Sequence, residues 1–401
     1  MERTHYLGIA AAGAGVAAAW RVCGSPGRAP TAAGTPAIAG AAAEAPPEAQ
    51  PDAGLEPVFL VGDAMARKSF LEAATATGAM VDGFVQGRAP PHLRVATGRP
   101  TAAGDVDDEE LALVPCDAPV SDTFDASAYF ADLKPQYPCR ALLYANIIGS
   151  TQTLLEQHPK LCFAQGSGLV CTARTQRKGR GRRTNQWESP PGCLLFSVGW
   201  KHADAKTVVF MQYLFGLALV DSIRLRPGYE DLDLRLKWPN DIYHGADTKL
   251  GGVLVSSSFA DGCFNLVIGC GFNVSNSKPT LCLDEVIDRH NATNGSSTPL
   301  PKIRMESVLA GALSQFSEDY ALLEKTGSFK PFLERYYRRW IHSGQSVDVV
   351  AEDGTKRSVV IAGVTDGGYL HGETASGGIP VELEPDGNTF DMMRGLIQRK
   401  L

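Results

Sequence analysis

The sequence predicts an α+β fold in which helices and strands share the central part of the chain and short strands alone occupy its C-terminal end. Two apolar runs, 193–198 and 249–255, are typical of buried strands. Apolar residues recur at near-helical spacing in three long segments, at 207–223, 305–323 and 329–339. After Gln345, Asp-Gly pairs separate short β-type runs, and this arrangement is a strong hairpin signal.

The composition fits a protein with a sizeable core and two or three domains. The chain has 401 residues, 44% of them hydrophobic, and a formal net charge of -6. A weakly acidic chain argues against general nucleic-acid binding, which needs a broad basic face, so we expect no nucleic-acid partner. The nine cysteines show neither a C-x-x-C pair nor zinc spacing, which favours free thiols in a reducing compartment.

Residues 1–54 are rich in Ala, Gly and Pro and resemble a disordered or transit-peptide-like segment. Scattered arginines with little acid are typical of organellar transit peptides, so we expect delivery to a chloroplast or mitochondrion, with the cytoplasm as the alternative. A secretory signal and plain disorder stay open. The apolar run 7–20 is too short and too rich in Ala and Gly for a bilayer span, so we expect no stable membrane association.

Residues 55–137 form an N-terminal extension of unknown role. The run 58–61 predicts a strand, 64–77 predicts a helix, and 83–108 is loop-like. No helix-turn-helix with a basic recognition helix is visible in this region.

Ser150 and Thr151 follow a strand that begins in the apolar run 141–144. A strand that leads into Ser-Thr and then into Leu-Leu-Glu predicts a strand, an N-cap and a helix. A plain helix cap is the alternative to a ligand-binding role for these hydroxyls.

A glycine-broken arginine loop follows the strand 168–173 and Gln176. Its five cations and two glycines are Arg177, Lys178, Arg180, Arg182, Arg183, Gly179 and Gly181. Arginine forks fit phosphate and carboxylate oxygens, and glycine lets the backbone approach a ligand closely. Because no acidic residue occurs in the loop before Glu188, we expect it to be mobile until an anion binds. A solvated basic loop is the alternative.

Two further strand ends carry polar groups. The alternating strand 232–237 ends in Trp-Pro followed by Asn240 and Asp241, where an amide can read a base or ribose and a carboxylate can hold magnesium. Lys249 enters a buried strand through two glycines, which favours an anion contact over a snorkelling side chain. The G-x-G at 269–271 lacks the following helix that dinucleotide binding requires.

The residue types present exclude several reaction classes. The sequence has no G-x-x-x-x-G-K-[ST] P-loop and no Ser-His-Asp or Cys-His set, and four histidines that fit no motif are interpreted as surface or structural: His158, His202, His244 and His290. Arginines, a lysine and an aspartate favour carboxylate adenylation. That reaction needs positive charge at the α-phosphate and the leaving pyrophosphate, and it needs no enzyme nucleophile.

Seven longer stretches occur in a fixed order over roughly 138–401. They are G-S-T-Q-T at 149–153, T-Q-R-K-G-R-G-R-R-T-N-Q-W-E-S-P-P-G-C at 175–193, L-K-W-P-N-D-I-Y at 236–243, K-L-G-G-V-L-V at 249–255, I-G-C-G-F-N-V-S-N at 268–276, Y-Y-R-R-W-I-H-S-G-Q at 336–345 and D-G-N-T-F-D-M-M-R at 386–394. In these stretches the chain resembles the biotin protein ligases, most closely the eukaryotic holocarboxylase synthetase group. Bacterial members continue the arginine loop with R-R-G-R-K-W, so whether Asn185 takes over the role of their loop arginine stays open.

The resemblance implies a mixed sheet flanked by helices, akin to class II aminoacyl-tRNA synthetases, in a catalytic domain over 138–343, and a small SH3-like β-barrel over 344–401. It implies that biotin and MgATP give biotinyl-5′-AMP and pyrophosphate. A specific lysine on a biotin carboxyl-carrier domain of a biotin-dependent carboxylase, such as acetyl-CoA carboxylase, then receives the biotin. Mg²⁺, ATP and biotin are implied, and no tightly bound prosthetic group.

The resemblance also implies roles for individual residues. The biotin-binding set is Ser150, Thr151, Gln176, Gly179, Arg180, Arg182, Lys249, Gly252 and Gly269. The nucleotide-binding set is Arg182, Trp187, Asn240, Asp241, Lys249 and Asn273. Arg182 and Lys249 are the implied catalytic residues, and Asp241 is the implied magnesium ligand. In the same way, the two glycines Gly252 and Gly269 are expected to leave room for the biotin rings.

Two other functions stay open as alternatives. A lipoate or octanoate protein ligase shares the fold and the adenylation chemistry, but the sequence has neither the R-R-x-x-G-G-G run nor the H-D pair of that group. A non-catalytic biotin-sensing module is the second alternative. In its repressor form it would need a DNA-binding domain, for which the N-terminal region offers no basic candidate.

Overall fold

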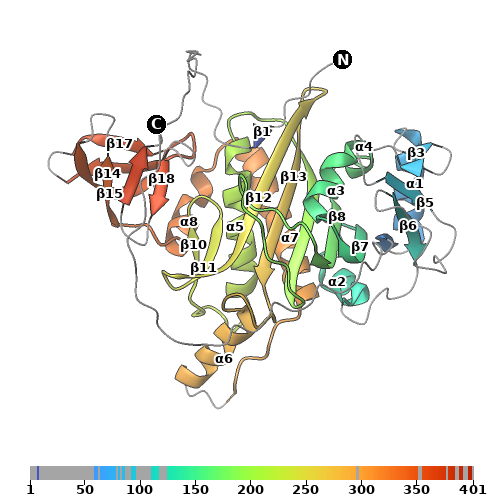
Figure 1. Ribbon diagram of the computed structural model, residues 1–401, viewed down its shortest axis with the longest axis horizontal. Coiled ribbons are helices and arrows are strands. Elements are labelled where there is room, and N and C mark those ends of the chain that lie inside the picture. Colours follow the sequence, from blue (N-terminus) through green and yellow to red (C-terminus); the bar gives the residue numbers. More distant parts are fainter. Residues whose placement is uncertain are drawn as a thin grey trace, which may run out of the picture.

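The computed structural model describes residues 124–294, 298–350, 355–375 and 378–383, with 58–61, 64–77 and the backbone of seven short strands at 7–8, 80–81, 84–85, 92–95, 110–116, 388–391 and 396–399. The transit-like segment predicted for 1–54 lies outside the described residues apart from strand β1 (Leu7–Gly8). Figure 1 shows a central body of sheet and helices with a smaller sheet at one side.

The described strands of the central body form one thirteen-stranded mixed sheet. Its order along the sheet is β10 (Leu234–Lys237), β11 (Asp241–His244), β12 (Thr248–Ala260), β13 (Cys263–Asn273), β9 (Cys193–His202), β8 (Leu169–Gln176), β7 (Ala141–Ile148), β2 (Val58–Val61), β6 (Glu110–Cys116), β5 (His92–Val95), β4 (Phe84–Val85) and β3 (Met80–Val81), with β1 paired to β12. The pairs β7–β8, β2–β6 and β5–β6 are parallel and the others antiparallel. The predicted α+β class with a mixed sheet is therefore confirmed.

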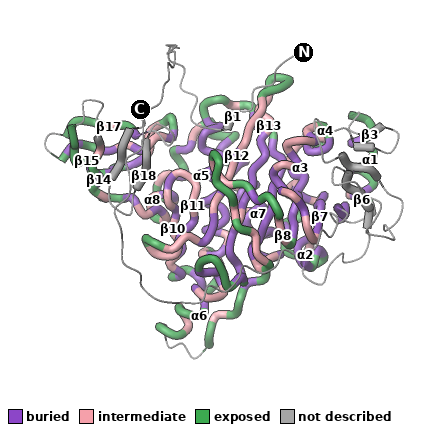
Figure 2. The backbone as a smooth tube through the Cα atoms, viewed as in Figure 1, coloured by how far each residue is buried: buried purple, intermediate pink, exposed green. Residues whose placement is uncertain are grey.

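Helices cover both faces of this sheet because its central strands are apolar on both sides. In β7, Leu142 and Tyr144 pack into one hydrophobic cluster, while Leu143 and Ala145 pack into another on the opposite face. The first cluster contains helices α5 (Met211–Arg224) and α7 (Met305–Thr326), and the second contains α1 (Ala64–Ala76), α3 (Thr151–Gln157) and α4 (Pro159–Cys162). Figure 2 shows these layers buried and the tip of the β12–β13 hairpin exposed.

Five shorter elements complete the central body. They are α2 (Ala126–Asp132), η1 (Val208–Phe210), α6 (Leu283–Asn294), η2 (Lys330–Phe332) and α8 (Leu333–Arg339). Helix α2 packs on α7, and α8 contacts α5 and β10, so α8 delivers the chain from the helical layer to the second sheet.

The second sheet has six described strands in the order β17 (Pro380–Leu383), β16 (Leu370–Thr374), β15 (Lys356–Val364), β14 (Ser346–Val350), β19 (Leu396–Arg399) and β18 (Asn388–Asp391). It is joined to the central body by buried hydrogen bonds. Trp238 Nε1 donates to the carbonyl of Gly368 at 3.2 Å, and the backbone N–H of Trp238 donates to His342 Nε2 at 2.9 Å. These contacts fix Trp238, which lies just before the turn that carries Asn240 and Asp241.

His342 must be neutral for this contact, because only an unprotonated ring nitrogen accepts a hydrogen bond. Its other nitrogen, Nδ1, then carries the proton and donates to Gln345 Oε1 at 2.9 Å. Burial lowers the pKa of His342 to about 4, and the hydrogen bond to Gln345 opposes that shift. The junction between the two sheets is therefore sensitive to acid.

Most predicted elements are confirmed with shifted ends, and one prediction is wrong. The segment 83–108 was expected to be loop-like, but β4 and β5 lie within it. These strands are only two and four residues long, too short to show a β pattern in the sequence. They form because β4 pairs with β5 and β5 pairs with β6. The G-x-G at 269–271 lies inside strand β13, which runs on to Asn273. Helix α6 and strand β16 were not predicted.

Candidate functional site

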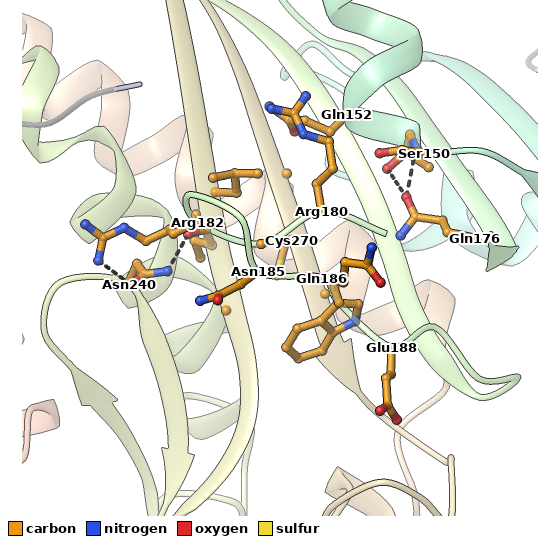
Figure 3. Close-up of a pocket in the computed structure, with 18 of the residues that line it drawn as sticks. Ser150, Gln152, Gln176, Arg180, Arg182, Asn185, Gln186, Glu188, Asn240 and Cys270 are labelled. Atoms are coloured by element: carbon orange, nitrogen blue, oxygen red, sulfur yellow. Dashed lines mark hydrogen bonds between the residues drawn. The ribbon is translucent and has the colours of Figure 1, made fainter. Parts of the chain in front are cut away.

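A cavity of about 520 Å³ opens on the sheet at the start of α3, beneath the arginine loop. Elements far apart in the sequence meet here: the first turn of α3, the loop between β8 and β9, the turn between β10 and β11, and strands β12 and β13 (Figure 3). The predicted site residues that line it are Ser150, Thr151, Gln176, Arg180, Arg182, Trp187, Asn240, Asp241, Lys249, Gly252, Gly269 and Asn273. Gly179 alone of the predicted set is not among the lining residues.

One end of the cavity is neutral and rich in hydrogen-bonding groups. Ser150 is the N-cap of α3, and its hydroxyl accepts from Thr153 N–H at 3.4 Å, so the predicted cap is confirmed. Thr151 donates to Gln176 Oε1 through its backbone N–H at 2.8 Å and through its hydroxyl at 3.1 Å. These contacts fix the Gln176 side chain beside two hydroxyl groups.

Gln152 also lines this end, and sequence reasoning missed it. Its side chain is buried and donates to the Val267 carbonyl at 2.9 Å, while its Oε1 accepts from Ser197 at 3.1 Å. A Cβ on Gly269 would lie 2.3 Å from Gln152 Oε1, so this glycine makes room for the glutamine. The S-T-Q order identified a cap, but nothing local to it indicated a contact with β13.

The arginine loop is a hairpin that folds over the cavity. Gly181 N–H donates to the Asn185 carbonyl at 2.8 Å, and Trp187 N–H donates to the Gly179 carbonyl at 3.0 Å. A Cβ on Gly179 would lie 2.3 Å from the Trp187 carbonyl oxygen, so this glycine permits the close crossing of the hairpin. Gly179 therefore shapes the loop from behind the cavity wall.

Two arginines of the hairpin point in different directions, and Arg182 lies beside Asn240 (Figure 3). Arg180 pairs with Glu156 of α3, with 2.5 Å between Nη1 and Oε2. Arg182 donates to Asn240 Oδ1 at 3.4 Å, and Asn240 in turn donates to the Val253 carbonyl at 2.9 Å. The loop itself offers Arg180 no acidic partner before Glu188. Sequence reasoning missed that Glu156 of helix α3 supplies one.

The other end of the cavity carries alternating charges. Lys249 Nζ donates to Asp241 Oδ1 at 2.7 Å and lies 5.7 Å from the centre of the Trp187 ring. A Cβ on Gly252 would lie 3.1 Å from Asp241 Oδ1 and 3.5 Å from Lys249 Nζ, so this glycine leaves room for the ion pair. Gly271 does the same for Trp187, whose ring would be 2.5 Å from a Cβ there.

Asn273 presents an acceptor without a partner at this end. Its Nδ2 donates to Thr280 Oγ1 at 2.9 Å and to the Leu281 carbonyl at 3.3 Å. Since a carbonyl can only accept, these contacts fix which amide atom is nitrogen. Its Oδ1 is buried and has no hydrogen-bond partner, and such a group is costly unless a ligand completes it.

Asp241 is the predicted metal ligand. Among the described residues, no group of three or more His, Cys, Asp and Glu side chains could hold a metal ion. Magnesium commonly binds through one or two carboxylates together with substrate phosphates, so the Asp241 carboxylate at the cavity fits a metal that arrives with a nucleotide.

Among the described residues no histidine lines the cavity, and the cysteine that lines it is not a reactive thiol. The cysteines whose side chains the structure describes are free, as predicted. Cys270 lines the cavity, and burial raises the pKa of its thiol well above its ordinary value, so it stays protonated. His202 is buried between Thr207 and Tyr320, which makes it structural, as expected.

The comparisons with known proteins identify the family. The sequence pattern of the biotin/lipoate A/B protein ligase family matches residues 144–273. Biotin–protein ligase 2 of Arabidopsis thaliana is 33% identical over 288 residues, which are 70% of this chain and 83% of that protein. The chain belongs to the biotin–protein ligase family. The resemblance inferred from the seven motifs is thus confirmed.

Two other relatives are much longer than the part of them that this chain matches. The human biotin–protein ligase is 37% identical over 288 residues, 70% of this chain and 38% of that protein. The Schizosaccharomyces pombe relative is 37% identical over 281 residues, 65% of this chain and 44% of that protein. The chain thus spans less than half the length of these two relatives. The solved structure of biotin protein ligase from Aquifex aeolicus in complex with biotin and ATP is 25% identical, with a TM-score of 0.44, and the match covers 61% of this chain and 95% of that one.

Within the part of the chain that the structure describes, no helix is long and apolar enough to span a membrane.

Proposed function

We propose that this protein is an ATP-dependent biotin protein ligase, which forms biotinyl-5′-AMP and transfers the biotin to a lysine of a biotin carboxyl-carrier domain. One observation carries the proposal. A single cavity joins a neutral hydrogen-bonding end to an end that holds Arg182, Asp241 and Lys249. This cavity matches a substrate whose neutral polar group binds at the first end and whose carboxylate reacts with a nucleotide at the second end.

The neutral end suits the ureido ring of biotin. That ring carries one carbonyl acceptor and two N–H donors, and hydroxyl and amide groups can serve both. Ser150, Thr151 and Gln176 supply these groups in our proposal, and the contacts between Thr151 and Gln176 hold them in place before the substrate binds. Gly252 and Gly269 have no side chain that would project from the strands into the cavity. The atoms nearest to a Cβ at either position belong to the protein itself.

The charged end suits the first chemical step. A carboxylate oxygen of biotin attacks the α-phosphorus of ATP, and the bond from that phosphorus to the bridging oxygen of pyrophosphate breaks. Negative charge grows on the phosphoryl oxygens and on the leaving pyrophosphate, so fixed cations lower the barrier. Lys249 has three donors and uses one on Asp241, so it can also contact the carboxylate and the bridging oxygen. Arg180 and Arg182 add charge from the loop.

The nucleotide-binding roles are proposals on the same basis. The unpartnered Asn273 Oδ1 would accept from the amino group of adenine, and the Trp187 ring would pack against the base. Asn240 and Asp241 would contact the phosphates and the Mg²⁺ that ATP brings. Bound magnesium would neutralise the charge of the phosphates, and Asp241 would be its protein ligand.

In the second step the ε-amine of a carrier lysine attacks the acyl carbon of the mixed anhydride, forms an amide and releases AMP. The test uses a recombinant biotin carboxyl-carrier domain with the protein, biotin, ATP and Mg²⁺. We expect one biotinyl group per carrier, only when ATP is present. A carrier in which the acceptor lysine is changed to arginine should stay unmodified. Absence of modification, or equal modification of the arginine carrier, would reject the proposal.

Three further assignments belong to the same proposal. The six-stranded sheet is a small SH3-like barrel, with domain boundaries near 137 and 343 and a region of unknown role at 55–137. Residues 1–54 direct the chain to a chloroplast or mitochondrion, with the cytoplasm as the alternative; their composition supports this, and one relative is named biotin–protein ligase 1, chloroplastic. A fluorescent reporter fused to residues 1–54 tests the targeting, and a purely cytosolic reporter would contradict it.

A further inference from the structure

The ion pair between Arg180 and Glu156 joins the arginine loop to helix α3, twenty-four residues away in the sequence. Its Nη1–Oε2 distance is 2.5 Å. The two ends are unlike: the Glu156 side chain is 11% exposed, whereas that of Arg180 is 44% exposed. The carboxylate therefore belongs to the rigid body of the protein, and the arginine reaches it from the surface.

Glu156 is held in position before the loop reaches it. Its Oε1 accepts from Gln152 Nε2 at 3.0 Å and from the Ser256 hydroxyl at 2.6 Å, so helix α3 and strand β12 both orient the carboxylate. These contacts use one oxygen and turn the other, Oε2, toward Arg180. A nearly buried carboxylate with two fixed donors is a preorganised anchor, which loses little freedom when a cation binds.

The anchor acts on the whole hairpin. The backbone of Arg180 forms a β-bridge with Gln186, and the turn from Gly181 to Asn185 lies between them. The side chain of Arg182, from the same turn, reaches Asn240 on the opposite side of the cavity. The hairpin is thus attached at two places, to α3 through Arg180 and to the β10–β11 turn through Arg182.

We propose that Glu156 is a positioning residue that latches the arginine loop over the cavity through Arg180, and that the latch retains the acyl-adenylate until the acceptor amine arrives. The second half of this inference rests on the proposed function. The first half does not, because it depends only on the ion pair and on the contacts that hold Glu156. The latch also opposes the repulsion among the loop cations, since it places a negative charge beside one of them.

Trypsin tests the latch without any substrate, because it cuts after the Lys and Arg residues that fill this loop. In Glu156→Gln the amide can still accept from Gln152 and Ser256, but it faces Arg180 without charge. Trypsin cuts the loop when it opens locally, and the variant lacks one charge-assisted contact that keeps the loop closed. We therefore expect cleavage within 177–183 to become about tenfold faster. The matched control is Glu334→Gln, which breaks the exposed pair of Glu334 with Arg338. It should leave loop cleavage unchanged.

Arg180→Gln removes the same ion pair from the half-exposed side, so it tests the latch even if the buried Glu156→Gln variant fails to fold. Its loop should also be cut about tenfold faster, at the cations that remain. If a folded variant of either kind is cut no faster than the wild type, the latch is wrong.

The dissociation rate of biotinyl-AMP tests the consequence. We expect Glu156→Gln to release the adenylate about tenfold faster, and the Glu156→Gln/Arg180→Gln double variant to match Arg180→Gln alone, because Glu156 acts through Arg180. If the two substitutions increased the dissociation rate additively in the double variant, Glu156 would not act through Arg180. If the wild type makes no biotinyl-AMP, the proposed function fails, while the trypsin result still decides whether the latch exists.

Discussion

Lys249 and Asp241 form an ion pair across neighbouring strands, with 2.7 Å between Lys249 Nζ and Asp241 Oδ1. Asp241 begins β11 and lies opposite Gly252 of β12, so the strand register brings the lysine and the carboxylate together. Both side chains are partly exposed to the cavity, at 37% and 22%. The pair orients the ammonium group while leaving two of its three donors for a bound anion.

Lys249→Ala should nearly abolish adenylate formation and leave the fold intact. Loss of a charge that stabilises the transition state costs on the order of 3 kcal/mol or more, or at least about 100-fold in rate. The measurement is biotin-dependent release of pyrophosphate, with a thermal melt to verify folding. Lys201→Ala, on the exposed side of β9, is the control. Release within about threefold of the wild type would rule out the role of Lys249.

Arg182→Gly should loosen the retention of the intermediate. The variant loses the contact to Asn240 and one cation over the cavity, so biotinyl-AMP should escape and label exposed lysines of unrelated proteins. The measurement is labelling of serum albumin with biotin and ATP, which we expect to rise about tenfold above the wild type. A variant that makes adenylate normally yet labels albumin no more than the wild type would show that Arg182 is not a retention group.

Asn273→Ala should weaken ATP binding and its preference over GTP. The unpartnered Oδ1 can accept from the amino group of adenine but not from the carbonyl that guanine presents at the same position. We expect KM for ATP to rise about tenfold with little change in kcat, and the ATP/GTP preference to narrow.

Asn276→Ala is the matched control for this variant. Asn276 is likewise buried with an unpartnered Oδ1, but it does not line the cavity. If the two variants have the same KM for ATP, Asn273 does not read the base.

His342 should make the protein less stable in acid. Burial lowers its pKa from 6.5 to about 4, so between these values the unfolded chain binds more protons than the folded one. The contribution of His342 to stability is full above pH 6.5 and is lost as the pH falls to about 4, by roughly 3 kcal/mol in total. Urea unfolding of the wild type and His342→Asn across this pH range measures the difference.

The variant should be less stable at pH 7 and should show a smaller loss on acidification. Parallel pH profiles for the two proteins would contradict the assignment to His342.

The sequence predicted those parts of the site that lie in continuous motifs. The N-cap at Ser150, the turn with Asn240 and Asp241, and Lys249 at the entrance of β12 could each be identified because local chemistry constrains them. Their convergence on one cavity follows from the order of strands in the sheet, which could not be predicted from the spacing of the motifs.

What the sequence could not predict depends on long-range contacts. Gln152 and Glu156 look like ordinary helix residues, and only the packing of α3 against β12 and β13 makes them part of the site. Gly269 was expected to make room for a ligand, yet its closest neighbour is Gln152. In the same way, β4 and β5 depend on pairing with neighbouring strands rather than on their own residues.

The central claim is that the cavity activates the carboxylate of biotin with ATP. The most direct measurement incubates the protein and Mg²⁺ATP with labelled biotin, lipoate or octanoate in parallel and identifies the AMP ester that forms. We expect biotinyl-5′-AMP from biotin and no ester from the other two acids. Formation of lipoyl- or octanoyl-AMP in place of biotinyl-AMP, or of no ester at all, would contradict the account.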